Sequence, residues 1–202
     1  VDPAEKKVFD VSKMDQWGIV LDHMMTKGVA FHWATTEIEN DLRLGARGNW
    51  SINRAVYYRE LVARFGHLQA LFINMGEENE LEPFQVARHV EFMRDVDPLG
   101  DERQIAVHSY NNGPDGQHYA RQPGTIDATS IQGITARYAY CARRYRSMSQ
   151  AIGHKMVVYG DENSPIVGLG VSNIGELRRD ALWGSLLGGG AGLEWYFGYA
   201  SQ

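Results

Sequence analysis

Two pairs of adjacent acidic residues each follow an apolar segment of strand length. Glu77 and Glu78 follow "ALFINM", and Asp161 and Glu162 follow "KMVVYG". A carboxyl at the end of a strand that faces a partly dry cavity has a raised pKa and can act as a general acid. Two opposed carboxylates can hydrolyse a glycosidic bond, with retention of configuration when they lie about 5 to 5.5 Å apart. The competing interpretation is that "EENELE" is a solvated loop whose acids favour the first turn of the next helix.

Other polar and aromatic residues end most of the remaining apolar segments. A histidine in such a place binds a sugar hydroxyl or forms a core hydrogen bond, and an aromatic residue stacks on a pyranose ring or packs in the core. The acids of "TTEIEND" could also bind Ca²⁺, but their spacing is not that of an EF-hand, so we expect no metal. The residues for which we expect substrate contact are His32, Glu37, Glu77, Asn79, His108, Tyr110, Gln132 and Trp195.

The segments that must position these residues alternate between two types. Longer segments with apolar residues at helical spacing alternate with short runs of apolar residues along the whole chain. The expected helices are 11–28, 52–68, 82–96, 136–153 and 173–189, and the expected strands are 29–33, 70–75, 104–110, 128–133, 155–160 and 192–198.

Strands that alternate with helices indicate an α/β fold with a parallel sheet, either doubly wound or a (β/α)8 TIM-type barrel. Because a barrel gathers the carboxyl ends of all its strands around one cavity, the polar residues at the strand ends favour the barrel. Six strands fall short of eight, so we expect an incomplete barrel that lacks two βα units before Val1. Its open edges would be covered by another chain, for example a second copy in a homodimer.

Composition narrows the class of protein. A chain of 202 residues with 44% hydrophobic residues can form one domain, residues 1–202, with its own core. A net charge of -5 gives no basic field for nucleic acid or an anionic membrane, and no apolar run has the length of a membrane span. Cys141 cannot form a disulfide within the chain, and we expect it in a helix core. The first residues carry no signal-peptide pattern.

No motif indicates a cofactor. "GLGVSNIG" has Asn173 where a dinucleotide-binding loop needs glycine, and it follows no predicted strand. The seven histidines form no zinc pattern, and Ser109 has no nucleophile-elbow context. We therefore expect neither a cofactor nor a serine hydrolase.

Four segments together resemble the catalytic barrel of modular bacterial retaining glycoside hydrolases, in the clan with agarase-like, cellulase-like and apiosidase-like members. They are "FDVSKMDQWGIVLDHMMTKGVAFHWATTEIEND", "YYRELVARFGHLQALFINMGEEN", "VVYGDEN" and "DALWGSLLGGGAGLEWYFGY". The likeness extends from about Val8 to Tyr199. It implies a secreted or periplasmic enzyme that cleaves a polysaccharide.

The resemblance also implies roles for the carboxylates. The acid/base glutamate of that clan ends strand 4 and the nucleophile ends strand 7, which correspond here to Glu78 and Glu162. Glu77 stands where the clan usually has asparagine, so either Glu77 or Glu78 could donate the proton. A second hypothesis follows from the missing strands: a non-catalytic carbohydrate-binding or structural remnant of such a barrel.

Overall fold

The computed structural model describes residues 8–45, 48–78, 81–108, 125–132, 138–163 and 174–195, and of Ile38, Glu162, Asn163, Ile174 and Trp195 only the backbone. In this part of the chain six parallel strands form one sheet, in the order of the sequence. They are β1 (Phe31–Ala34), β2 (Leu71–Asn74), β3 (Ile105–Val107), β4 (Ala128–Gln132), β5 (Val157–Asn163) and β6 (Leu193–Trp195). The predicted order and direction of the strands are confirmed.

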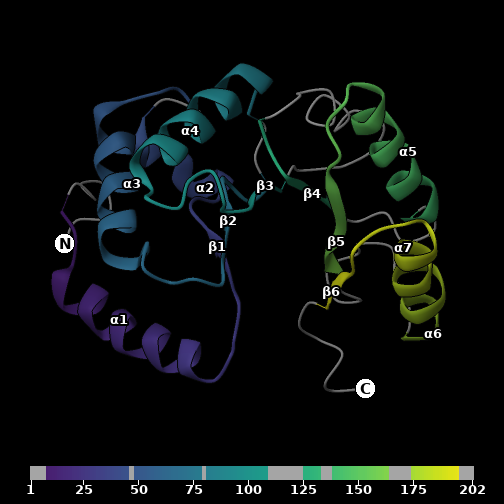
Figure 1. The fold of residues 1–202 in the computed structure, drawn as a ribbon, viewed down its shortest axis with the longest axis horizontal. Helices are drawn as coiled ribbons and strands as arrows, with labels where there is room; N and C mark the ends of the chain where they lie inside the picture. Colours follow the sequence, from purple (N-terminus) through teal and green to yellow (C-terminus); the bar gives the residue numbers. More distant parts are fainter. Residues whose placement is uncertain are drawn as a thin grey trace.

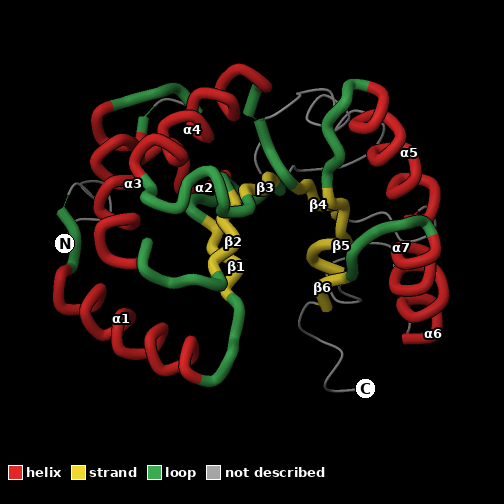
Figure 2. The backbone as a smooth tube through the Cα atoms, in the orientation of Figure 1, coloured by secondary structure: helices red, strands yellow, loops and turns green. Residues whose placement is uncertain are grey.

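The sheet curls into a half-barrel. Figure 1 shows it as an arch, with the helices on its outer side and the edge strands β1 and β6 flanking the open side. Figure 2 shows the same layering of helices around the strands. The helical elements are α1 (Val11–Thr26), α2 (Ile38–Asp41), η2 (Leu42–Leu44), α3 (Ile52–Phe65), α4 (Pro83–Val96), α5 (Tyr138–Ala151), α6 (Ile174–Glu176), the π-helical η5 (Leu177–Leu182) and α7 (Trp183–Leu187).

The core lies between the sheet and these helices. On α3, Tyr58, Leu61 and Phe65 follow one another at helical spacing and are 0%, 6% and 7% exposed. They pack with strand residues such as Ile73, which is 1% exposed. Cys141 of α5 is buried in the same core, as predicted. One continuous apolar layer therefore holds the helices against the convex face of the sheet.

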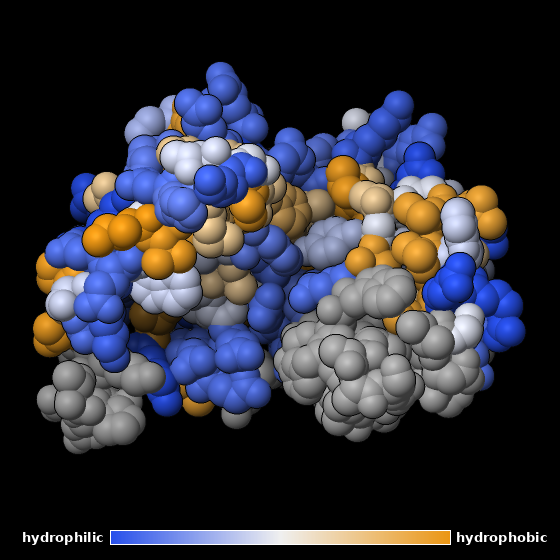
Figure 3. All heavy atoms as spheres, turned by 90° about the horizontal axis from the view of Figure 1, so that it is seen from below, coloured by the Kyte–Doolittle hydropathy of each residue, from blue (hydrophilic) through white to orange (hydrophobic). Residues whose placement is uncertain are grey.

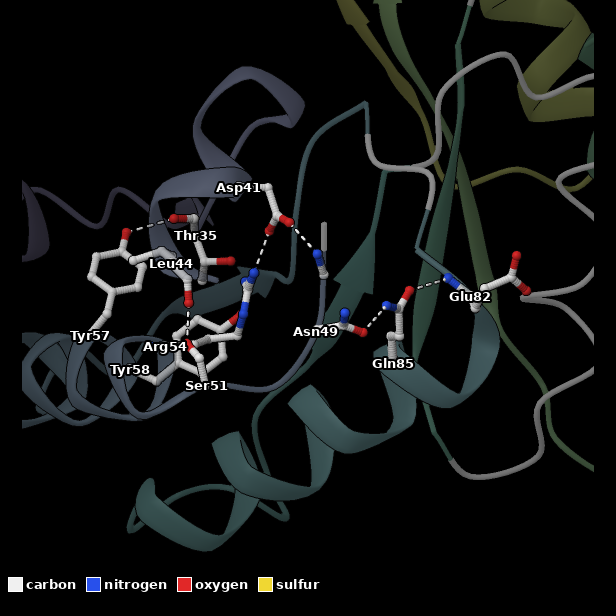
Figure 4. A network of polar contacts seen from close by, with 11 residues as sticks. Thr35, Asp41, Leu44, Asn49, Ser51, Arg54, Tyr57, Tyr58, Glu82 and Gln85 are labelled. Carbon is white, nitrogen blue, oxygen red and sulfur yellow. Dashed lines mark hydrogen bonds and ion pairs between the residues drawn. The ribbon is translucent and has the colours of Figure 1, made fainter. Parts of the chain in front are cut away.

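A buried ion pair fixes the connection between α2 and α3 (Figure 4). Arg54, which is 0% exposed, donates to Asp41 over 2.6 Å, and Asp41 also accepts from the backbone of Gly48. The Tyr57 hydroxyl donates to the carbonyl of Thr35 over 2.6 Å and so attaches α3 to the end of β1. These bonds hold the chain after β1 in place at the carboxyl end of the sheet.

Three details differ from the sequence prediction. The segment 155–160 was expected to end before the acids, but β5 continues to Asn163 because it pairs with both β4 and β6 there. The helix predicted at 173–189 is divided by the π-helical turns of η5. Helix α1 has the predicted position but no fully buried residue, since its apolar side chains, such as Met14 and Leu21, are only partly covered by the core.

Hydrophobic side chains also remain on the surface. Trp17 and Ile19 of α1 are 59% and 72% exposed, and Leu187 of α7 is 80% exposed. In Figure 3 the hydrophobic atoms gather in separate patches on both halves of the molecule. Among the described helices, none has the length and apolar character that a membrane span requires.

Candidate active site

The alternation of side chains along the strands defines which residues face the inside of the half-barrel. Residues two apart on a strand share one face, so Tyr159 and Asp161 lie on the same face of β5, and Gln132 lies beside Asp161 in the register with β4. The Tyr159 ring contacts the rings of His32 on β1 and Phe72 on β2, with centroids 6.0 and 6.1 Å apart. Because β5 is not a neighbour of β1 or β2, these contacts cross the concave side of the sheet.

Glu78 is held by a residue from another strand. The side-chain amide of Gln132, the last residue of β4, donates to a Glu78 oxygen over 2.6 Å. Glu78 itself has a left-handed backbone with φ 44°, a conformation that is unfavourable for a residue other than glycine. A strained backbone and a cross-strand hydrogen bond together orient this carboxylate, an arrangement typical of functional sites.

Asn74 organises the turn that leads to Glu78. Its side-chain oxygen accepts from the backbone N–H groups of Gly76 and His108, each over 3.2 Å. Asn74 is 0% exposed, so these bonds lie in the interior. They connect the chain after β2 to the chain after β3, which brings His108 close to the acidic residues.

Glu37 and Glu77 extend the pairing of β1 with β2. The two residues form a parallel bridge, and the Glu77 N–H donates to the carbonyl of Thr36 over 2.8 Å. Burial raises the pKa of Glu77, and the negative charges of Glu194, Glu37 and Glu78 raise it further. Glu77 is therefore a second candidate for a proton-donating carboxyl.

A second polar group lies at the ends of β3, β5 and β6. His108 and Asp161 are 0% and 1% exposed, and His108 Nδ1 lies 3.5 Å from Asp161 Oδ2. The pKa of Glu194 is raised to about 8, first by a hydrogen bond with Asp161, then by burial and by the charge of Asp161. This end of the sheet therefore holds a protonated carboxyl at neutral pH.

The two histidines of the site are neutral at pH 7. Burial lowers the pKa of His108, against the opposing effects of the Glu78 charge, a hydrogen bond with Gln132 and the Glu194 charge. Partial desolvation also lowers the pKa of His32, with Glu194 opposing and His108 reinforcing the shift. Both side chains can therefore donate and accept hydrogen bonds without adding positive charge.

The sequence-predicted residues divide into two groups. The structure brings six of them to the carboxyl ends of the strands or to the concave face. It describes only the backbone of Glu162 and Trp195, and Asn79 and Tyr110 lie outside the described residues. The six are His32, Glu37, Glu77, Glu78, His108 and Gln132.

Sequence reasoning missed three residues of the site. Asn74 and Tyr159 lie inside the predicted strands 70–75 and 155–160, and neither was expected to contact substrate. Glu194 stands beside Trp195, for which substrate contact was expected. The signal for Glu194 is its place between two apolar residues in the last predicted strand. Because side chains alternate along a strand, this pattern puts Glu194 on the opposite face from its apolar neighbours.

An apolar cavity borders this site at His32. The cavity has a volume of about 510 Å³ and lies between α1, β1 and α3, and its mostly apolar lining includes Trp17, Phe31 and Phe65 as well as His32. None of the acidic strand-end residues lines it, so we place the candidate site at those acids. Among the described residues, no group of three or more His, Cys, Asp or Glu side chains is arranged to hold a metal ion.

Comparison with known proteins gives no assignment, since no family model, curated protein or solved structure matches the chain. The site is thus defined by its geometry: carboxyl groups on or directly after four strands, two neutral histidines and the Gln132 amide.

Proposed function

We propose that this chain is a glycoside hydrolase of the (β/α)8 barrel type that cleaves a polysaccharide by a retaining mechanism. The observation that carries the proposal is the position of Glu78, whose carboxylate is oriented by Gln132 from a different strand of a parallel half-barrel. Glycoside hydrolysis requires two carboxyl groups in unlike environments, and this end of the sheet gathers several.

The proposed mechanism has two displacements. Glu162 attacks the anomeric carbon and forms a glycosyl ester, while Glu78 gives its proton to the departing glycosidic oxygen. Glu78 then takes a proton from water, and the resulting hydroxide displaces Glu162 from the anomeric carbon. The Gln132 amide donates to a Glu78 oxygen over 2.6 Å and so holds this carboxyl in one orientation during both steps.

Glu77 is the competing proton donor. Its pKa is raised, first by burial and then by neighbouring acids, as a general acid requires. Replacing each residue separately by glutamine decides between them. The true donor is the one whose loss reduces cleavage of poor leaving groups far more than cleavage of activated aryl glycosides.

A second candidate function is carbohydrate binding without catalysis. The observation that favours it is that β1 and β6 are both unpaired edges of the described sheet, so the barrel is open on one side. Binding needs only polar and aromatic surface, whereas catalysis needs both carboxyls held in register. For either function we propose a secreted or periplasmic protein, because structural polysaccharides such as cellulose and xylan lie outside the cells that degrade them.

The test is a screen for new reducing ends with cellulose, xylan, mannan, agarose and pectin. We expect one to be cleaved, with the β or α configuration retained in the first product seen by ¹H NMR. Glu78→Ala and Glu162→Ala should each reduce turnover by about 10³-fold or more. Azide should then give a retained glycosyl azide with the first variant and an inverted one with the second.

The matched control is Glu91→Ala, which removes an exposed glutamate of α4 that forms a surface ion pair with Arg88. It should keep full activity. Binding without cleavage of any polysaccharide by the unmodified protein would favour the second function, and near-full activity of both catalytic variants would refute the roles given to Glu78 and Glu162.

A further inference from the structure

An irregularity in the sheet sets Glu194 opposite two acidic positions. Gly160 pairs with Leu193 and Asn163 pairs with Trp195, so two residues of β5, Asp161 and Glu162, lie opposite the single residue Glu194 of β6. Extra residues of this kind are frequent at barrel rims and beside active sites. The irregularity falls at the segment that the proposed mechanism uses.

Asp161 forms the buried side of this arrangement. It is 1% exposed, lies beside Gln132 in the register of β4 and β5, and faces His108 at 3.5 Å. Gln132 in turn holds Glu78 at 2.6 Å. A continuous series of polar contacts therefore connects Glu194, through Asp161, to the residues around the proposed acid/base.

Glu194 forms the exposed side. The Glu194 side chain is exposed to solvent, whereas Asp161, which lies opposite it on β5, is buried. Other charged or titratable groups act on it from several elements. They are Asp161 and Tyr159 on β5, His32 on β1, Glu77 after β2 and His108 after β3.

Two carboxyl groups in hydrogen-bond contact cannot both be ionised at low cost, so they share one proton. The pKa of Glu194 is raised to about 8, first by this hydrogen bond, which agrees with a proton held at neutral pH. The solvent-facing side of Glu194 then acts as a neutral hydrogen-bond acceptor toward a solute.

We propose that Glu194 is a further substrate-binding residue of this site and Asp161 its positioning residue, so that the Glu194 carboxyl accepts a hydrogen bond from a sugar hydroxyl. This inference rests on the proposed glycosidase function. It also specifies a substrate class. A site lined with carboxyl groups can bind uncharged sugars through hydrogen bonds, whereas it would repel the negative charges of uronic acids and sulfated sugars.

The first arm of the test needs no substrate. Protein labelled with ¹³C at glutamate Cδ is titrated by NMR, and the signal that Glu194→Gln removes is assigned to Glu194. That signal should titrate near pH 8, and in Asp161→Asn its midpoint should fall by one pH unit or more, to about 7 or below, because the like charge is gone. Glu91→Gln, an exposed α4 variant, should leave it unchanged.

The second arm uses the polysaccharide that the panel above identifies. Glu194→Ala should raise KM by about tenfold with a smaller change in kcat, as expected for one lost hydrogen bond. Glu194→Gln should keep the KM of the unmodified protein, since its amide oxygen still accepts and its N–H₂ still donates to Asp161.

The outcomes separate the two proposals. A midpoint for Glu194 in the usual acidic range of a carboxyl overturns the carboxyl pair, whether or not the protein cleaves a polysaccharide. This measurement needs only the unmodified protein and Glu194→Gln, so it decides the question even if Asp161→Asn does not fold. An unchanged KM in Glu194→Ala overturns the substrate contact in an active enzyme. A raised midpoint together with no cleavage of any polysaccharide refutes the glycosidase function, and the substrate role of Glu194 with it, while the pair itself stands.

Discussion

Acidification should destabilise this protein through a buried histidine far from the strand ends. His89 of α4 is 0% exposed and lies between the rings of Trp50 and Tyr58, with centroids 5.9 and 6.0 Å away. Burial lowers its pKa to about 4, and the positive charge of Arg54 reinforces the shift. The charge of Asp41 and the polar backbone of Gly48 oppose it.

The sign and size of the effect follow from proton linkage. The pKa of His89 in the folded protein lies below the unfolded value of about 6.5, so folding keeps the imidazole neutral. The associated stability is fully present above the unfolded pKa and is lost as the pH falls toward the folded pKa. The complete loss is about 3.4 kcal/mol for the shift of about 2.5 pH units, and a change from pH 7 to pH 5 removes about 2 kcal/mol.

The assay is urea denaturation at both pH values for the unmodified protein and for His89→Phe. Phenylalanine keeps an aromatic ring beside Trp50 and Tyr58 but cannot bind a proton. Titration of the carboxylates affects both proteins equally, so the unmodified protein should lose about 2 kcal/mol more than the variant. His67→Gln, which alters an exposed histidine that contacts Asp22, should behave as the unmodified protein. Equal losses in the unmodified protein and His89→Phe, within about 0.5 kcal/mol, would refute the reasoning.

Three further outcomes test the fold. Arg54→Ala should destabilise the protein by about 3–5 kcal/mol in urea because it leaves Asp41 without its buried partner, whereas Arg59→Ala, at an exposed position of the same helix, should change stability by less than about 0.5 kcal/mol. Gly160→Ala should cost about 1–3 kcal/mol, since the added Cβ would collide with Leu193 of the adjacent strand, and thermal unfolding measures it. Light scattering should show a homodimer if a second copy covers the edge strands β1 and β6, and a monomer at high concentration would contradict that expectation.

The layout of the fold was readable from the sequence because each element carries a local signal. Helix α3 begins at Ser51, whose hydroxyl accepts from the Arg54 N–H over 3.1 Å, and its apolar residues repeat at helical spacing. Strand β4, predicted at 128–133, has all five residues buried, because it lies between β3 and β5 and not because its residues are strong strand formers. Burial between its neighbouring strands, and not the intrinsic preference of its residues, therefore makes this segment a strand.

The site was only partly readable. Carboxylates at strand ends marked Glu77 and Glu78, since the position of a strand end follows from local pattern. The pairing of Asp161 with Glu194 depends on where β5 and β6 go out of register, and no local pattern in either segment encodes that shift. The contact between Gln132 and Glu78 likewise requires the curvature of the sheet, which is a property of all the strands together.

That curvature is also what turns strand-end carboxylates into candidate catalytic groups. In a flat sheet β1 and β5 would lie four strand spacings apart, about 19 Å, yet the His32 and Tyr159 rings meet with centroids 6.0 Å apart. The rings of His32, Phe72 and Tyr159 thus form an aromatic layer inside the arch, one step before Asp161 along β5. This layer lies beside the acidic groups inside the arch, and burial is the first cause of the raised pKa of Glu77 and of the lowered pKa of His108. The same residues on a flat, two-sided sheet would be solvated carboxylates with ordinary acidity, so the chemistry proposed for this site depends on the closure of the sheet as much as on the acids themselves.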